Sequence, residues 1–238
     1  MPIDTQKLLK YSGLFGVGLA LLGGILYYRE RKAAGKGLFG LGDSYRPGRF
    51  NEAPIVDSYD DGDMKTTLRE SADMPIEERI ASIQKLIEKS VMDPQMRKLA
   101  FDITKSCPER DGVCEAKKIY KWVKKNVKYQ GDIAPIKMSN GKTEGIDLYQ
   151  SARRTVELGA GDCDDMSVLI STLLAEVGIQ SRLKVVAQAV DEDWSHIFPT
   201  ALLPKFAPTY AVAVDATLPG SHKFGVEAPS VKLIEFDA

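Results

Sequence analysis

The chain has 238 residues, of which 44% are hydrophobic, and its 32 basic and 33 acidic residues give a net charge of −1. This composition excludes a wholly disordered or collagen-like chain, and the length suits one ordinary domain with appendages. Residues 1–36 are basic and the remainder is acidic, so we expect no nucleic acid among the partners. Three cysteines and two histidines exclude a disulfide scaffold and argue against a zinc site, so we expect no cofactor.

A charge-free stretch near the N-terminus predicts a membrane anchor. Residues 11–28 carry no charge, and as a helix they would span about 27 Å, close to the hydrocarbon thickness of a bilayer. Tyrosines mark both ends and basic residues follow at once, as is typical of spanning helices: Tyr11, Tyr27, Tyr28, Arg29, Arg31 and Lys32. We therefore predict an anchor over residues 1–32. A cleaved signal peptide and a buried soluble helix are the alternatives, and the charges that follow and the five glycines within the stretch disfavour them.

Two further features of this stretch concern partners and orientation. Gly16, Ala20 and Gly24 recur every four residues, which predicts homo-association of membrane helices, although glycine is also common in membrane helices without that role. Basic residues are more numerous on the C-terminal side of the stretch. The positive-inside rule then predicts a single-pass protein of a bacterial inner membrane or a membrane-associated virion, with its main body on the cytoplasmic side.

Residues 33–75 predict a flexible linker, and residues 76–238 predict the globular domain. The linker is rich in glycine, carries the acidic run DSYDDGD and shows no persistent helical or strand period. Apolar residues at helical spacing then predict three helices, which begin near Pro75, at Asp93-Pro94 and after the break CPERDGVC. The lysines of the third helix are predicted to form a solvated face.

Cys107 and Cys114 flank the break between the second and third helices. They form either a disulfide, in an oxidising compartment or a mature particle, or two reduced thiols near helix ends. The predicted cytoplasmic location favours the reduced thiols. A metal site is disfavoured because no further cysteine or histidine lies nearby in the sequence.

A fourth helix follows two glycines and carries the third cysteine. Its apolar residues, from Met166 to Val177, follow the pattern i, i+3, i+4, i+7, i+8, i+11, which predicts a helix with one buried face. Asp162 is a predicted N-cap with Asp165 three residues on, and Gly178 is the predicted C-terminal glycine. Cys163 then lies in the first turn, where the helix dipole favours a thiolate and the free N–H groups can stabilise an oxyanion; Asp164 and Asp165 oppose this by their charge. The alternative is a small core cysteine beside a purely structural cap.

The period changes to two after this helix, which predicts strands over residues 181–190, 195–203 and 209–216 in an antiparallel sheet packed on helices. Pro199 is predicted to mark an edge or a bulge. His196 begins the second strand and Asp215 lies near the end of the third. With Cys163 they have the parts of a nucleophile, a base and an orienting group, although His222 is a rival base if the order is Cys-Asp-His.

These residues carry a resemblance to a known family. The segments IYKWVKKNVKYQGD, SARRTVELGAGDCDD, WSHIF and VDAT, within roughly residues 95–220, resemble the transglutaminase-like superfamily, especially the bacterial and phage branch of transglutaminase-like cysteine proteinases. The resemblance implies a papain-like α+β fold with the triad Cys163, His196 and Asp215, acting on amide bonds through a thioester. Many relatives have an aromatic residue directly after the histidine, where this chain has Ile197-Phe198, and this departure concerns substrate shape. Some relatives bind calcium near the cysteine; Asp164 and Asp165 are the candidates here, although such a pair is more typical of a cap.

The resemblance and the anchor together predict a membrane-tethered cysteine peptidase or amidase that acts on a protein or peptide substrate. Water resolves the thioester in a hydrolase, and an amine resolves it in a transamidase that cross-links proteins. The alternative from another class is a structural or interaction component of a membrane-associated virion or assembly, in which the fold is used for contact.

Overall fold

The computed structural model describes residues 67–71, 75–132, 136–137, 143–144, 146–190, 193–220 and 222–238. The predicted anchor and most of the predicted linker lie outside these ranges, so both stay predictions. Within the described ranges, no helix is both long and apolar enough to cross a membrane.

Three helices precede the site in the chain, at the predicted places: α2 (Ile76–Val91), α3 (Pro94–Thr104) and α4 (Gly112–Asn126). α3 begins as the sequence predicts, because the Asp93 side chain accepts a hydrogen bond from the backbone of Gln95 and proline occupies the first turn. Asp111 caps α4 in the same way by accepting from the backbone N–H of Cys114. The short α5 (Ala152–Leu158) follows later and ends at Gly159, whose φ of 61° is left-handed.

The main sheet has four strands in the order β10-β7-β8-β9, all antiparallel. The predicted strands are found as β7 (Ser181–Ala187), β8 (His196–Leu203) and β9 (Tyr210–Ala213). β7 and β9 end earlier than predicted, so Asp215 lies beyond β9, and β10 (Lys232–Asp237) was not predicted. Three two-stranded pairs complete the described strands: β1 (Thr67–Ser71) with β5 (Ile146–Gln150), β2 (Lys128–Tyr129) with β6 (Ala160–Gly161), and β3 (Ile136–Lys137) with β4 (Thr143–Glu144).

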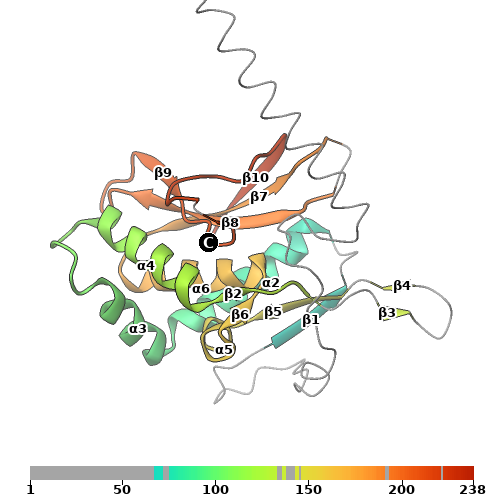
Figure 1. Ribbon diagram of the computed structural model, residues 1–238, viewed down its shortest axis with the longest axis horizontal. Coiled ribbons are helices and arrows are strands. Elements are labelled where there is room, and N and C mark those ends of the chain that lie inside the picture. Colours follow the sequence, from blue (N-terminus) through green and yellow to red (C-terminus); the bar gives the residue numbers. More distant parts are fainter. Residues whose placement is uncertain are drawn as a thin grey trace, which may run out of the picture. The chain divides into compact units, whose positions relative to one another are not determined.

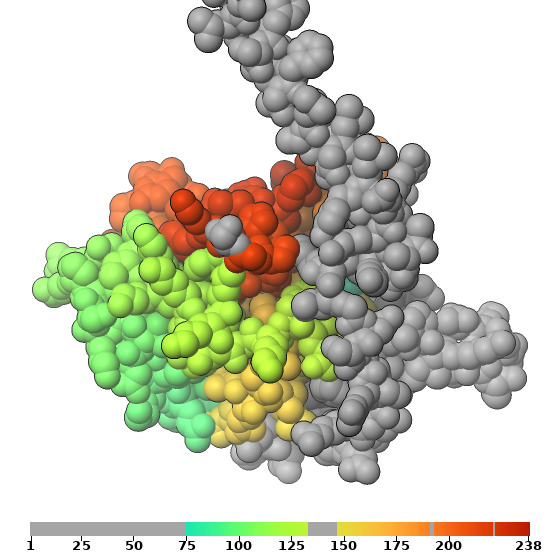
Figure 2. Space-filling view, in the orientation of Figure 1, coloured from blue at the N-terminus to red at the C-terminus, as the bar shows by residue number. Residues whose placement is uncertain are grey.

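The helices lie on one face of the four-stranded sheet (Figure 1), which confirms the predicted α+β class. On the face seen in Figure 2, residues of α3 and α4 lie directly beneath those of the C-terminal strands. β1 falls inside the range predicted as linker, and its pairing with β5 joins that part of the chain to the domain. This pairing shows that residues 67–71 belong with the domain, and the exact boundary between linker and domain stays a prediction.

The fourth predicted helix, α6 (Cys163–Glu176), is at the centre of the domain. It packs against α2, α3, α4, α5 and β8. The sequence predicted one buried face for this helix. In the structure the helix is buried on all sides from Asp164 to Leu174. Two of its buried polar side chains donate hydrogen bonds to carbonyl groups: Thr172 to that of Val168 within the helix, and Ser167 to that of Ile197 in β8.

Cys107 and Cys114 form a disulfide that closes the turn between α3 and α4. The sequence left this pairing open and favoured reduced thiols, and the structure corrects that preference. The turn brings the two Cα atoms within 5.7 Å of each other, which is the usual separation for a disulfide. Cys163 is left as the free cysteine.

Candidate active site

Cys163 is the first residue of α6, as the sequence predicts. Asp162 accepts hydrogen bonds from the backbone N–H groups of Asp164 and Asp165, and the Asp165 side chain accepts one from the backbone of Asp162. This reciprocal capping box confirms the predicted cap and fixes the first turn that carries the thiol. Among the described residues, the backbone N–H of Cys163 has no such acceptor.

The chain approaches Cys163 through Gly161, and the structure explains why glycine is needed there. A Cβ at this position would lie 2.6 Å from the Cβ of Asp165, much closer than two carbon atoms can pack. Gly161 also pairs with Tyr129 in the parallel β2–β6 contact, in which the backbone of Gln130 donates to the Gly161 carbonyl. The glycine therefore lets the approach strand lie directly against the first turn of α6.

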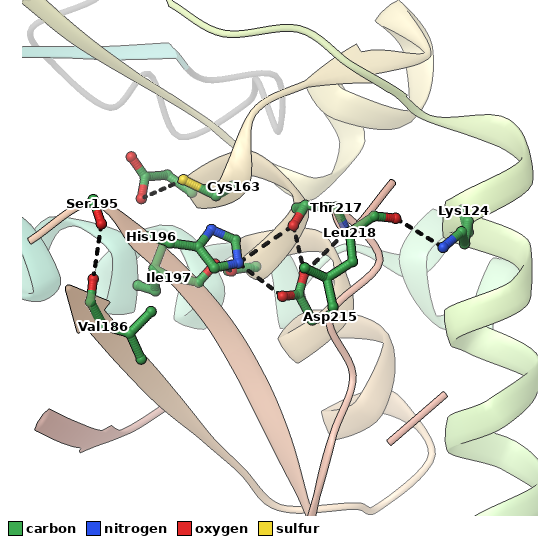
Figure 3. Close-up of polar contacts among 11 residues, drawn as sticks. Lys124, Cys163, Val186, Ser195, His196, Ile197, Asp215, Thr217 and Leu218 are labelled. Atoms are coloured by element: carbon green, nitrogen blue, oxygen red, sulfur yellow. Dashed lines mark hydrogen bonds and ion pairs between the residues drawn. The ribbon is translucent and has the colours of Figure 1, made fainter. Parts of the chain in front are cut away.

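His196 and Asp215 form a buried pair on the sheet. His196 is the first residue of β8, and Asp215 follows the end of β9 by two residues. The distance from His196 Nε2 to Asp215 Oδ2 is 2.8 Å, and both side chains are almost completely excluded from solvent. Figure 3 shows the imidazole between Asp215 on one side and Cys163 on the other. The structure thus brings together the three residues that the sequence singled out.

Thr217 is a member of this group that the sequence analysis missed. Its hydroxyl donates to Asp215 Oδ1 at 2.5 Å, and its backbone N–H donates to the same oxygen at 3.1 Å. The hydroxyl also lies 3.4 Å from His196 Nε2. The spacing Asp-x-Thr was the available signal, because a carboxylate often accepts from the backbone two residues on. Thr217 therefore fixes the carboxylate that holds the imidazole.

Helix α4 supports the segment that follows Asp215 (Figure 3). Lys124 Nζ donates to the Leu218 carbonyl at 2.9 Å, and the Tyr120 hydroxyl donates to the His222 carbonyl at 2.6 Å. Lys124 belongs to the lysine run that was predicted to be a solvated face, so for this residue the prediction is wrong. Its ammonium group supplies a donor to the carbonyl of the buried Leu218, three residues after Asp215.

His222, the rival base, does not join this group. Its side chain is exposed, and Nδ1 contacts the Pro219 carbonyl within its own loop. His196 and Asp215 are by contrast almost completely buried and contact each other. The order Cys-His-Asp therefore describes the arrangement, and Cys-Asp-His does not.

A small cavity of about 70 Å³ lies beside the thiol. Cys163 and His196 both line it, so the sulfur and the imidazole border the same space. Residues of α2 line the other side, among them Arg79, which the sequence analysis did not single out. The cavity is where a substrate carbonyl carbon would meet the thiol.

The electrostatic environment of Cys163 differs from the prediction. Burial raises the pKa of the Cys163 thiol well above its ordinary value, and the carboxylates of Asp164 and Asp162 raise this pKa further. A hydrogen bond from the backbone of Ile197 acts in the opposite direction. In contrast to the expected stabilisation of the thiolate, burial and the two carboxylates favour the neutral thiol in this structure.

The carboxylates near Cys163 form a buried acidic cluster. Burial, together with the neighbouring carboxylates, raises the pKa of Asp132 to about 8 and that of Asp165 to about 7. The pKa of Asp164 is raised to about 6, mainly by burial, with Arg79 acting against the rise. The backbone and side chain of Gln150 both donate to Asp165, at 2.7 and 2.5 Å. These hydrogen bonds hold in place a carboxyl group that also completes the cap of α6.

The resemblance implies calcium in some relatives, and the donor chemistry here is partly suited to it. The sulfur of Cys163 and one carboxylate oxygen each from Asp162 and Asp164 lie within 4.8 Å of one another. Calcium prefers oxygen donors, so the two carboxylates fit and the thiol does not. Asp165, the other predicted candidate, is engaged by Gln150 and Asp162.

A family comparison agrees with this geometry. Residues 97–209 match the model of the transglutaminase-like superfamily. Over these residues the chain is similar to that superfamily, and the domain that contains them is called the transglutaminase-like domain below. This confirms the resemblance at the level of the superfamily, and the finer assignment to the bacterial and phage proteinase branch stays a prediction. No curated protein matched the sequence significantly.

Three solved structures resemble the transglutaminase-like domain at low identity. A "putative cysteine protease" from Cytophaga hutchinsonii is 19% identical over 60% of this chain and 45% of its own, with a TM-score of 0.38. A "putative protease" from Parabacteroides distasonis is 13% identical over 57% and 29%, with a TM-score of 0.38. LapG from Legionella pneumophila, EGTA-treated, is 16% identical over 56% and 70%, with a TM-score of 0.36. The chain spans less than half of the length of the first two proteins.

Proposed function

We propose that the transglutaminase-like domain is a cysteine peptidase or amidase that hydrolyses an amide bond in a protein or peptide through a thioester. One observation carries the proposal: the buried His196–Asp215 pair, with 2.8 Å between Nε2 and Oδ2, borders the same cavity as the Cys163 thiol. A nucleophile, a base and a group that orients the base are the parts that such chemistry requires. The superfamily match over residues 97–209 includes the first two of these residues.

In this mechanism His196 is the base for Cys163. Asp215 binds Nε2, so the proton of the thiol passes to Nδ1, the ring nitrogen on the Cys163 side (Figure 3). The raised pKa of Cys163 means that the resting thiol is neutral, and transfer of its proton to the imidazole accompanies attack on the carbonyl carbon. Asp215 then stabilises the imidazolium that forms.

Collapse of the tetrahedral intermediate completes acylation. The carbon–nitrogen bond breaks, the leaving amine takes the proton from His196, and the acyl group remains on the sulfur as a thioester. His196 then takes a proton from a water molecule, which attacks the thioester carbon. The carbon–sulfur bond breaks, the acyl group leaves as a carboxylic acid, and His196 returns the proton to the sulfur. The backbone N–H of Cys163, at the positive end of α6, is the donor that we assign to the negative oxygen in both steps.

Membrane tethering through residues 11–28 is part of the proposal and rests on the sequence alone. Two observations favour opposite sides of the membrane for the domain. The basic residues after the predicted anchor favour the cytoplasmic side, whereas the Cys107–Cys114 disulfide is typical of an oxidising compartment. Protease digestion of intact and opened cells that express the full-length protein distinguishes the two orientations. A bacteriophage origin also stays a proposal that only the source of the sequence can test.

A thiol-directed activity probe and a protein substrate test the proposed function. Full-length wild-type protein in detergent should react with the probe and should release new amino termini from denatured casein, whereas Cys163→Ala should do neither. Addition of a primary amine such as cadaverine separates hydrolysis from transamidation, because an amine found in the product would identify a cross-linking enzyme. If wild type and Cys163→Ala are equally inert while both remain folded, a structural role replaces the enzymatic one.

A further inference from the structure

The exposed side of α4 carries a run of lysines that the proposed function does not use. Between Cys114 and Lys128 the chain has six lysines and one acidic residue, Glu115. Lys124 is engaged with the Leu218 carbonyl. The other five are exposed and are called the lysine face below: Lys117, Lys118, Lys121, Lys125 and Lys128. In Figure 2 the residues of α4, in light green, lie on the side of the domain turned to the reader.

The helical members of the lysine face form one strip. Because an α-helix has 3.6 residues per turn, Lys117, Lys121 and Lys125 follow one another on successive turns of the same side. Lys118 lies beside them, and Lys128 follows in β2, two residues after the helix ends. The other side of α4 is apolar and belongs to the core, through Ala116, Ile119 and Val123.

Within the described part of the chain, no carboxylate neutralises this strip. Glu115 forms its ion pair with Lys205, 2.5 Å between Nζ and Oε2, and none of the five lysines forms an ion pair with a described residue. Lysines at i and i+4 repel each other, whereas a merely solvated helix face typically alternates acidic and basic residues. The strip therefore destabilises the helix, and it concentrates positive charge on a chain that is net acidic outside residues 1–36.

The loop after Asp215 adds a further cation beside α4. The Tyr120 hydroxyl donates to the His222 carbonyl at 2.6 Å, and the Tyr120 and Phe224 rings are in edge contact, with 5.9 Å between their centroids. Lys223 lies between these two contacts in the chain and is exposed. Positive charge therefore extends from the helix onto the neighbouring loop.

An extended anionic surface suits this arrangement better than a small ligand. Exposed lysines on a convex helix enclose nothing, so a small anion would stay hydrated and would gain little from them. Helices that carry roughly four to eight basic residues are typical of binding to anionic lipid headgroups, where each lysine adds to the attraction. The flexible lysine side chain places its charge among the headgroups while its methylene groups cover apolar surface.

We propose that the lysine face of α4 docks on the anionic surface of a lipid membrane. The inference goes beyond the peptidase function and does not require catalysis; the predicted anchor supplies only the reason why the domain and a bilayer meet. Docking leaves the walls of the cavity beside Cys163 free, because its lining residues lie in α2, α6, β7, β8 and the segment before β8. The membrane then orients the domain through α4, and the active site stays open to a polypeptide.

Lysine labelling in nanodiscs tests the docking. Full-length protein is incorporated into nanodiscs of phosphatidylcholine alone, or of phosphatidylcholine mixed equally with phosphatidylglycerol. After acetylation, mass spectrometry gives the labelling rate of each lysine. We expect the rates at the lysine face to fall about fivefold in the anionic nanodiscs and to recover at about 0.5 M salt, which screens the attraction. Lys85 of α2 and Lys98 of α3 are also exposed and should be labelled equally in both lipids.

A triple variant makes the test specific to α4. Lys117→Gln/Lys121→Gln/Lys125→Gln removes three charges from the strip and keeps side chains that favour a helix. Lys118 and Lys128 remain as reporters. Their protection by anionic lipid should be largely lost, because the attraction depends on the summed charge of the face.

The matched control removes the same charge elsewhere. Lys85→Gln/Lys98→Gln/Lys105→Gln changes three exposed lysines of α2, of α3 and of the residue that ends α3. The lysine face of this control should be protected by anionic lipid as in the wild type. Circular dichroism of both triple variants verifies that the fold is kept.

The outcomes decide the proposal. Equal labelling of the lysine face in neutral and anionic nanodiscs would overturn it, as would an equal loss of protection in both triple variants. Stronger protection by soluble polyglutamate than by anionic lipid would assign the face to an acidic polypeptide instead. If the full-length protein is soluble without detergent and does not enter nanodiscs, the predicted anchor fails, and the same labelling with preformed vesicles of the two lipids tests the lysine face by itself.

Discussion

Both oxygens of the Asp215 carboxylate are engaged, and this decides how firmly the imidazole is held. Oδ2 binds His196, while Oδ1 accepts two hydrogen bonds from Thr217. A carboxylate held at both oxygens cannot rotate away from the ring without breaking buried hydrogen bonds. Thr217 is therefore a positioning residue, which acts on His196 through Asp215.

We expect Thr217→Val to lower kcat roughly tenfold with little change in KM, because loss of one buried hydrogen bond of about 1–2 kcal/mol loosens Asp215 without altering the cavity beside Cys163. Steady-state kinetics on a peptide substrate provides the measurement. Thr217→Ser keeps the hydroxyl and should restore most of the rate. Equal losses in Thr217→Val and Thr217→Ser would contradict this role, because Thr217→Ser keeps the hydroxyl that donates to Asp215.

The two carboxylates beside Cys163 lead to a second prediction. Asp164 raises the pKa of the thiol, and its own pKa is about 6. Asp164→Asn should therefore speed alkylation of Cys163 by iodoacetamide at pH 8, where Asp164 is ionised in the wild type. The gain should vanish near pH 5, where the wild-type carboxyl is protonated as well. Measured rates of alkylation against pH provide the test.

Histidine variants are the controls for this experiment. His196→Ala should slow alkylation at pH 8, since the thiol loses its base. His222→Ala should leave the rate unchanged, because that ring is exposed and bonded within its own loop. Slower alkylation in Asp164→Asn would contradict the electrostatic account of Cys163.

The elements of the domain were largely predictable from the sequence, because their signals are local. Capping residues mark the starts of α3 and α6, and a glycine marks the end of α6. β10 was missed although its burial alternates along the strand, since six residues after a long irregular stretch carry little pattern. Pro199 was predicted to mark an edge or a bulge, and the edge is excluded because β8 has neighbours on both sides. Its carbonyl accepts from Val214 just beyond the paired residues of β9, so the missing N–H falls where that ladder ends.

Pairing between distant elements was not predictable in this way. The spacing of Cys107 and Cys114 allowed either a disulfide or two reduced thiols. The predicted cytoplasmic location favoured reduced thiols, whereas the structure has a disulfide. The triad residues were found because a family pattern connects them. Thr217 and Arg79 were missed because their roles depend on contacts with Asp215 and with the cavity, which no local period reveals.

The disulfide gives a prediction at the scale of the α3–α4 turn. It closes a short loop with a sequence separation of 7. A cross-link over such a loop lowers the entropy of the unfolded chain and stabilises the folded state by about 2.5 kcal/mol. A reducing agent should therefore lower the Tm of the wild type and leave that of the double variant Cys107→Ser/Cys114→Ser unchanged. Thiol titration of denatured, unreduced protein should count one free cysteine. A count of three would show that the disulfide does not form in the protein.

At the scale of the whole domain, carboxyl groups from separate segments converge around the first turn of α6. Asp132 follows β2, whereas Asp164 and Asp165 belong to the helix itself. Because their pKa values are raised in the folded state, ionisation of these groups opposes folding. The free energy of unfolding should therefore decrease as pH rises from about 4 through about 8, since the folded state retains protons that the unfolded chain has lost.

Asp132→Asn should relieve part of this repulsion, because it removes a buried charge and keeps an oxygen that can accept from the backbone of Leu148. We expect a gain of at least about 1 kcal/mol at pH 8.5, which is roughly 2–4 °C in Tm, and a smaller gain at pH 5. Thermal unfolding monitored by circular dichroism measures both. Asp102→Asn removes the same charge from an exposed site and should leave the pH dependence unaltered. If the Tm of Asp132→Asn depends on pH in the same way as that of the wild type, ionisation of Asp132 does not cause the loss of stability at high pH.

Trp194 gives the domain an internal optical reporter. It lines the cavity beside Cys163, and Lys232 of β10 lies over its ring, with 4.1 Å from Nζ to the ring centroid. The chain has two tryptophans, so in a Trp122→Phe background all indole fluorescence arises beside the cavity. Indole emission depends on local polarity and on nearby charge, and a peptide that displaces water from this space should change it. Titration of Trp122→Phe/Cys163→Ala with a peptide that the wild type cleaves should therefore give a saturable change in emission, which makes occupancy of the site visible without a label and before any bond is broken.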